Sequence, residues 1–124
     1  MRFQSCLEAP FSLCGLLGRI EEGAFWRLPD DIIDTISPNI SLIARRSSGG
    51  RVRFRTNASE ISFRMRLKNL EPAQCMPLSG SAGADIFTGV GENSRFCGFI
   101  APENYEDRTA KTTIHTKGTL EQYT

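Results

Sequence analysis

The chain has 124 residues, of which 40% are hydrophobic and 23% are charged. These are values of a globular protein rather than of a disordered chain, and the length suits one domain with an ordinary core. The net charge of +1 gives the chain as a whole no electrostatic attraction to nucleic acid or to acidic lipid.

The first 36 residues predict an extension over residues 1–9 and then two short strands, at 11–17 and 24–28. Pro29-Asp30-Asp31 is expected to break the chain after the second strand. The apolar run 11–17 is far too short to cross a bilayer, and no positively charged leader or small-residue cleavage site accompanies it. We therefore expect a cytoplasmic protein without a membrane segment.

One short helix is expected near residues 38–46. Ser37 suits the N-cap, and Pro38 fits the first helical position, where its missing N–H costs nothing. Ile40, Leu42, Ile43 and Ala44 supply an apolar face, and Gly49-Gly50 ends the helix.

Residues 51–68 show the clearest pattern in the chain. Apolar and polar side chains alternate strictly in 51–56 and again in 60–68, on either side of Asn57-Ala58-Ser59. This period of two predicts two strands joined as an antiparallel hairpin. The side chains expected to point to a core are Val52, Phe54, Ile61, Phe63, Met65 and Leu67, with the arginines pointing away.

The remainder predicts a long loop over 69–84 and four further strands. These strands are expected at 85–88, 95–100, 111–116 and 119–124. Short strands with frequent turns indicate a mainly β fold, an antiparallel β-sandwich that is jelly-roll-like. Alternation that runs up to Thr124 leads us to expect a domain over 10–124, truncated before its last strands.

Neither a metal site nor a complete catalytic set is apparent. The four cysteines form no Cys-x-x-Cys pair, and His115 is the single histidine, so zinc has few ligands and we expect no metal and no cofactor. Cys97 is expected to be a reduced, buried thiol. Ser79 and Ser81 stand in a glycine-containing loop, but no Gly-x-Ser-x-Gly elbow is present. We expect no catalytic residue.

The basic residues are concentrated in one segment. Residues 45–68 hold eight basic side chains and one acidic side chain, net +7, and the rest of the chain is net −6. Mutual neutralisation is the simpler interpretation. A nucleic-acid interface is disfavoured, because Phe54 and Phe63 fall on the face opposite the arginines and cannot form a shared stacking platform with them.

Five segments taken in order carry a resemblance to a known family. They are Phe11–Leu16, Phe25–Pro29, Gly50–Asn57, Met76–Ser79 and Gly83–Phe87. This order resembles the N-terminal β-sandwich domain of SGNH (GDSL-type) esterases, named for its Gly-x-Asp-Leu-Tyr motif. Ile86 and Phe87 replace the Leu and Tyr of that motif, which removes one hydroxyl group.

The resemblance implies a non-catalytic accessory domain similar to a carbohydrate-binding module. Its partner would be a C-terminal SGNH hydrolase domain of the same parent chain, acting on a carbohydrate ester. Gly83, Asp85 and Phe87 form the structural motif, with Gly83 expected at a loop entry of positive φ. Trp26, Arg27 and Asp85 are the candidates for ligand or interdomain contact, and Asp85 is expected to accept loop N–H bonds or to pair with an arginine.

Two alternatives stay open at this point. The domain could be a free-standing carbohydrate-binding module with Trp26 as the stacking platform, or a nucleic-acid-binding β domain using Arg53, Arg55, Arg64 and Arg66. An oligomer is compatible with either.

Overall fold

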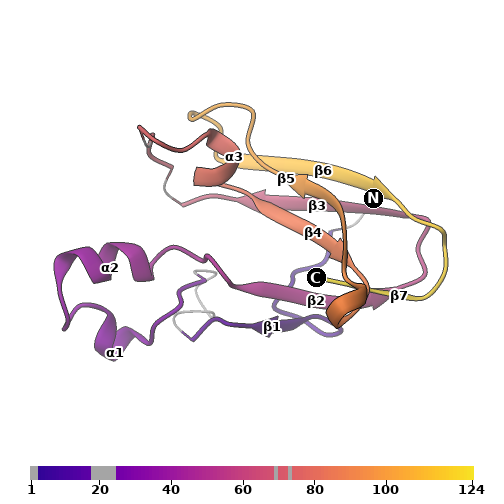
Figure 1. Cartoon of the computed structure of the whole chain (residues 1–124), viewed down its shortest axis with the longest axis horizontal. Helices are drawn as coiled ribbons and strands as arrows, with labels where there is room; N and C mark the ends of the chain where they lie inside the picture. Colours follow the sequence, from indigo (N-terminus) through magenta and orange to yellow (C-terminus); the bar gives the residue numbers. More distant parts are fainter. Residues whose placement is uncertain (1–2, 18–24, 69, 73) are drawn as a thin grey trace. The chain divides into compact units, whose positions relative to one another are not determined.

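The computed structural model describes residues 3–17, 25–68, 70–72 and 74–124. The protein is mainly β, with short helical segments between the strands (Figure 1). The chain divides into two compact units, Met1–Phe54 and Arg55–Thr124.

The first unit contains a two-stranded pairing and two helices. Strand β1 (Ser12–Cys14) is antiparallel to β2 (Arg51–Thr56), with Leu13 opposite Val52. Next to this pair, the ring of Phe11 packs edge-on against Phe54 at 5.2 Å between centroids. Helix α1 (Asp30–Ile33) and helix α2 (Pro38–Ala44) follow, and each buries its last residue.

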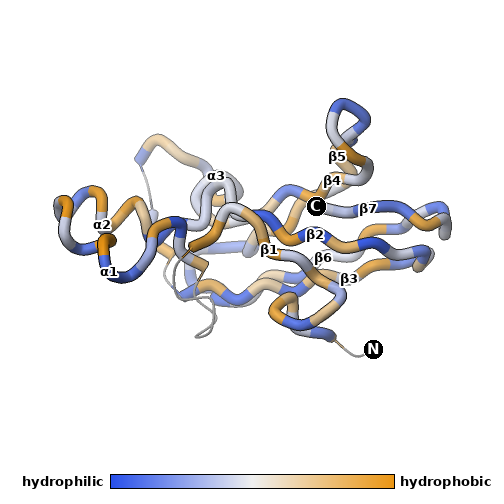
Figure 2. The backbone as a smooth tube through the Cα atoms, turned by 90° about the horizontal axis from the view of Figure 1, so that it is seen from below, coloured by the Kyte–Doolittle hydropathy of each residue, from blue (hydrophilic) through white to orange (hydrophobic). Residues whose placement is uncertain are grey.

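The predicted helix is confirmed as α2. The Ser37 side chain accepts a hydrogen bond from the Ile40 N–H, and Pro38 stands in the first turn. Helix α1 differs from the expected break at Pro29-Asp30-Asp31: Pro29 is the N-cap of a single helical turn, and Asp30 and Asp31 lie in that turn, where acidic side chains are favoured. Figure 2 shows hydrophobic and hydrophilic residues interleaved along both helices.

The strand expected over 24–28 is largely wrong. Of the described residues in that range, Trp26 alone makes a bridge, in which its carbonyl accepts from the Leu17 N–H at 3.0 Å. Residue 24 lies outside the described residues. Leu28-Pro29 and the helix that follows leave too little extended chain for a strand.

The second unit is a small two-layer β-sandwich. One sheet has the order β7-β4-β5, formed by Glu121–Tyr123, Ala84–Thr88 and Arg95–Ile100. The other pairs β3 (Glu60–Arg66) with β6 (Thr109–His115). The sheets pack closely at Gly98, where an added Cβ would lie 3.1 Å from Ile114 Cγ2. Buried in this unit are Leu70, Ala82, Ile86, Ile100, Ala110, Ile114 and Tyr123.

The predicted hairpin is wrong, although both of its strands exist. Strand β2 pairs with β1, whereas β3 is paired along its whole length with β6, from Glu60–His115 to Arg66–Thr109. The connection between β2 and β3 bonds to the end of β6, since the Thr116 N–H donates to the Ser59 carbonyl at 2.9 Å. The length of the Asn57–Ser59 connection would also allow a hairpin, so the pairing is decided by the contacts of β2 with β1 and of β3 with β6.

The predicted inward-facing residues are half-buried rather than core. Met65 and Leu67 are half-buried between exposed Arg64, Arg66 and Lys68, as alternation requires. Arg53 breaks the expected pattern, because it is half-buried and its Nε atom is buried without a hydrogen-bond partner. Strand alternation thus predicts the face of a side chain but not how deeply the fold covers that face.

The remaining elements modify the expected loops and turns. Helix α3 (Leu78–Ser81) lies within the predicted loop. Residues 69 and 73 of that loop are outside the described part. The 3-10 turn η2 (Gly91–Asn93) joins β4 to β5.

Cys97 is exposed, so the prediction of a buried thiol is wrong. Cys97 lies at a β-bulge, where Ile86 pairs with Gly98 and Phe87 with Phe96. Its Sγ is part-buried and donates to the Ile86 carbonyl at 3.2 Å.

Candidate functional site

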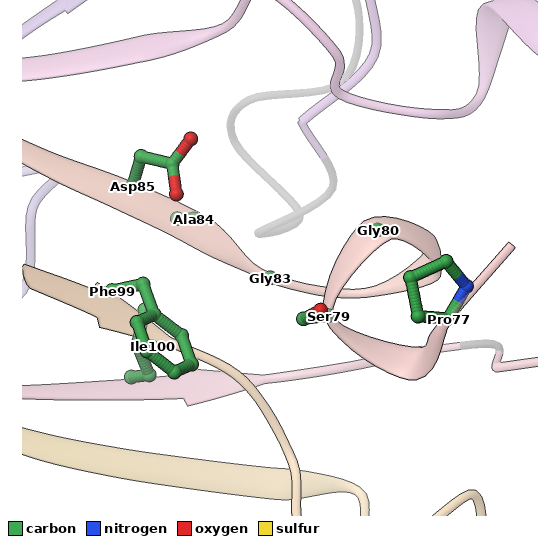
Figure 3. Close-up of a pocket in the computed structure, with 8 residues that line it drawn as sticks. All are labelled: Pro77, Ser79, Gly80, Gly83, Ala84, Asp85, Phe99 and Ile100. Atoms are coloured by element: carbon green, nitrogen blue, oxygen red, sulfur yellow. The ribbon is translucent and has the colours of Figure 1, made fainter.

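A depression of about 490 Å³ lies where α3 leads into β4 in the second unit (Figure 3). Its lining comes from α3 and the residues flanking it, the start of β4 and the end of β5. The lining residues are Pro77, Ser79, Gly80, Gly83, Ala84, Asp85, Phe99 and Ile100. The Gly-x-Asp part of the motif singled out from sequence therefore forms one wall of this pocket.

Gly83 is required here by a close approach of the backbone rather than by its φ angle. The φ of Gly83 lies outside the left-handed region, so the expectation of positive φ is wrong. A Cβ at this position would stand 2.9 Å from the Ile100 carbonyl oxygen and 3.0 Å from that of Ser79. Two backbone carbonyls cannot rotate away as a side chain can, so the entry to β4 excludes every side chain.

Asp85 stands directly across the ladder from Phe99, and both side chains are exposed. In Figure 3 the Asp85 carboxylate projects from β4, with Phe99 on the neighbouring strand. Among the residues that the structure describes, this carboxylate makes no side-chain hydrogen bond or ion pair, so neither loop N–H groups nor an arginine reach it. The pocket thus presents a solvated anion beside an exposed aromatic ring.

Phe87, the last residue of the motif, packs within the sheet. Its ring meets Phe96 of β5 edge-to-face, at 5.8 Å between centroids and 75° between planes. The next residue, Thr88, donates its hydroxyl proton to Glu121 Oε2 at 2.7 Å and so fastens β4 to β7. Phe87 and Thr88, toward the C-terminal end of β4, therefore contact the neighbouring strands. Gly83, Ala84 and Asp85, at its N-terminal end, line the pocket.

The pocket does not assemble the groups of a serine hydrolase. Ser79 lines it, but no histidine is among its described lining residues. His115 belongs to β6, is 79% exposed at its side chain, and lies 3.8 Å from Glu60 Oε2. The Ser81 hydroxyl donates to the Pro77 carbonyl at 3.2 Å. Acyl transfer needs a nucleophile, base and orienting acid in mutual contact, and the described lining of this pocket does not bring such a set together.

Trp26, in the first unit, has one face of its ring covered. The guanidinium carbon of Arg45 lies 4.8 Å from the ring centroid, a cation–π geometry. Arg45 in turn donates through Nη2 to both carboxylate oxygens of Asp34 at 2.7 Å. A sugar could not stack on the face of Trp26 that the guanidinium covers. The Ser41 hydroxyl joins this cluster, donating to Asp34 and accepting from Arg45 Nη1. Asp34, Ser41 and Arg45 were not singled out from the sequence, although the four-residue spacing of Ser41 and Arg45 was a usable signal.

Arg27 donates hydrogen bonds to the carbonyls at the C-terminal end of α2. Its backbone N–H donates to the Ala44 carbonyl at 3.1 Å, and its Nη2 donates to the Ile43 carbonyl at 3.4 Å. The last carbonyls of a helix lack partners within it and carry partial negative charge, so the guanidinium is favoured there. The three residues predicted as contacts thus fall at two places, Trp26 and Arg27 in one unit and Asp85 in the other.

The outward face of the β3–β6 sheet is polar and basic. Arg64 stands directly opposite Lys111, next to the hydrogen-bonded hydroxyls of Ser62 and Thr113 at 2.7 Å. Like charges directly opposite one another in a ladder are unfavourable. Phe63, the aromatic residue of β3, alternates to the other face, so this surface lacks the stacking groups of a single-strand nucleic-acid binder.

The described residues contain no group of three potential metal ligands among His, Cys, Asp and Glu. Among them there is also no helix with the length and apolar character needed to span a membrane.

All four cysteines are free. Removal of the thiol from water, followed by the charge of Glu121, raises the pKa of Cys97.

Comparison with models of protein families matches residues 1–124 to the family described as GxDLY, the N-terminus of Esterase_SGNH_hydro-type. The chain belongs to this family. The GxDLY signature falls on Gly83–Phe87, which spans the pocket wall and the packed middle of β4. Comparisons with curated proteins and with solved structures gave no match.

Proposed function

We propose that this GxDLY domain is a non-catalytic accessory domain that docks on the SGNH-type catalytic domain of its parent esterase. Its role is to position that domain and to shape one wall of a site for carbohydrate esters. Membership of a family defined as the N-terminus of SGNH-type esterases supports the partner. The open pocket at the Gly83–Asp85 end of β4 supports the place of contact.

The exposed Asp85 carboxylate is the single observation that carries this proposal. The carboxylate has no partner among the described residues and lies across the ladder from exposed Phe99. Aromatic residues are enriched at protein interfaces, and a charge at the rim can pair with an opposite charge of the partner. An esterase reaction centre would instead bury its ionisable groups and arrange them around a nucleophile. The carboxylate is therefore best assigned to recognition of a basic or N–H-rich patch on the catalytic domain.

The test compares the parent esterase with and without residues 1–124, using p-nitrophenyl acetate and an acetylated oligosaccharide as substrates. We expect no turnover by residues 1–124 alone. In the parent, Asp85→Arg is expected to lower kcat/KM or interdomain stability, because it reverses the charge at the contact.

Glu92→Arg is the matched control, since Glu92 is an exposed acid in η2 outside the pocket. Equal behaviour of the two charge reversals would contradict the docking role of Asp85. Turnover by the isolated domain that Ser79→Ala abolishes would contradict the non-catalytic role.

A further inference from the structure

The first unit shows how this chain holds a guanidinium group. The guanidinium carbon of Arg45 lies 4.8 Å from the centroid of the Trp26 ring. The Nη2 of the same guanidinium donates to both carboxylate oxygens of Asp34 at 2.7 Å. An aromatic face and a carboxylate therefore act together on one cation. A guanidinium suits both groups because it is planar, weakly hydrated and rich in N–H donors.

The second unit presents the same two kinds of group at Asp85 and Phe99. These residues stand directly opposite one another in the β4–β5 ladder, so their side chains belong to one face, with Cβ atoms about 5 Å apart. Phe99 is 55% exposed. Among the described residues, neither its ring nor the Asp85 carboxylate is paired with an arginine or a lysine.

Both side chains border the pocket beside α3 (Figure 3). Its volume of about 490 Å³ is ample for the end of one long side chain. Asp85 is the single charged residue in the described lining, and the Ser79 hydroxyl is a further acceptor. The pocket therefore combines a negative charge, hydrogen-bond acceptors and an exposed ring, which together favour a cation that can stack.

We propose that Asp85 and Phe99 form a binding site for one arginine side chain, which the catalytic domain of the parent esterase presents. The inference rests on the proposed function, in which that domain docks at the same pocket. It adds the type of residue and its pose. The guanidinium stacks on Phe99, donates two N–H groups to the Asp85 carboxylate and has the Ser79 hydroxyl as a further acceptor.

The lining selects arginine over lysine and over a sugar. A lysine ammonium is a compact, strongly hydrated charge that cannot lie flat on a ring while it donates in two directions. A sugar would need donors as well as acceptors for its hydroxyl groups, whereas Ser79 supplies the one side-chain donor of the described lining.

The strength of such a site indicates a tethered occupant rather than a free ligand. A cation–π contact and an ion pair at exposed residues each change an equilibrium constant by less than about tenfold. This is too little to capture free arginine from dilute solution. A side chain in the same polypeptide acts at an effective concentration in the millimolar range, so weak contacts are sufficient to hold it.

NMR titration of residues 1–124 tests the site. The ligands are N-acetyl-arginine amide, N-acetyl-lysine amide and N-acetyl-citrulline amide, which has the shape of the arginine compound without its charge. We expect the arginine compound to shift the Asp85 and Phe99 amide resonances at concentrations up to about 100 mM. The lysine compound should bind at least about threefold more weakly, and the citrulline compound should cause no shift.

Matched variants assign the response to the two side chains. Asp85→Asn should abolish it, and Phe99→Leu should weaken it about threefold or more. Glu92→Gln and Phe96→Leu should respond as the unchanged protein does, since Glu92 is an exposed acid and Phe96 an exposed ring outside the pocket. Absence of shifts with the arginine compound, equal shifts with the lysine or citrulline compound, or a full response of Asp85→Asn would overturn the proposal.

The outcome is separable from that of the proposed function. A domain that binds the arginine compound, in an esterase that is indifferent to loss of residues 1–124, would retain the guanidinium site and refute the accessory role. A domain that ignores the arginine compound, in an esterase that requires residues 1–124, would retain the accessory role and refute the guanidinium site.

Discussion

Arg45 covers one face of Trp26, with 4.8 Å between the guanidinium carbon and the ring centroid. The same guanidinium is anchored at its other side, because both oxygens of Asp34 accept from Nη2 at 2.7 Å. Cation–π contact and a carboxylate pair therefore act on one side chain at the end of α2. These contacts give Trp26 a structural role in the first unit.

Arg45→Ala is expected to destabilise the protein by about 1–2 kcal/mol, because it removes the ring contact and the Asp34 pair together. Trp26 is the single tryptophan, so its fluorescence during urea unfolding reports on the change. Arg46→Ala is the control, since Arg46 is an exposed neighbour without a described side-chain interaction. Similar unfolding midpoints for both variants would show that the Trp26–Arg45 contact contributes nothing.

Gly83→Ala is expected to cost about 1–3 kcal/mol of stability, because the new methyl group would press on two backbone carbonyls. Gly80→Ala is the matched control within α3: its Cβ would meet Met76 and Pro77 at 3.7 Å, an ordinary contact. Thermal unfolding should show a lower Tm for the first variant and an unchanged or slightly higher Tm for the second. An unchanged Tm for Gly83→Ala would contradict the close approach of the Ile100 and Ser79 carbonyl oxygens to residue 83.

Lys111→Glu is expected to stabilise the protein by about 0.2–1 kcal/mol, because it places an acid opposite Arg64 in the β3–β6 ladder. Lys117→Glu makes the same charge change at an exposed residue outside that ladder. Urea unfolding at low and high salt separates the two effects, since a cross-strand ion pair weakens as salt rises. A gain that is the same for both variants would indicate a net-charge effect instead.

Alkylation of Cys97 should be slow at pH 7.5 and should rise steeply at higher pH. Its pKa is raised, first by removal from water and then by Glu121, so little reactive thiolate is present near neutrality. Glu121→Gln removes the negative charge, lowers that pKa and should speed the reaction with iodoacetamide, followed by mass spectrometry. Glu103→Gln, in an exposed turn, should leave the rate unchanged; an equal acceleration would argue against the Glu121 effect.

Local patterns predicted several elements of this fold well. The Ser37-Pro38 start of α2 was predictable because a cap and a first-turn proline act within one turn of the chain. The 95–100 strand was placed at the residues where it occurs, and the adjoining strands were placed within a few residues. The order of five segments, among them Gly83–Phe87, likewise indicated the family that the comparison found. That Gly83 and Asp85 line a pocket was not predicted from the sequence.

Three features depended on the tertiary structure: which strands pair, how deeply their side chains are buried, and why residue 83 is a glycine. Alternation in β2 and β3 is the same whichever strand lies beside them, so the sequence could not show that β2 pairs with β1 and β3 with β6. The bulge at Cys97 and the carbonyls that crowd Gly83 likewise depend on contacts between β4, β5 and α3, which the local sequence does not specify. Short-range preferences determine where strands and helices form, whereas hydrogen bonds and packing between distant segments decide which edges and side chains remain open.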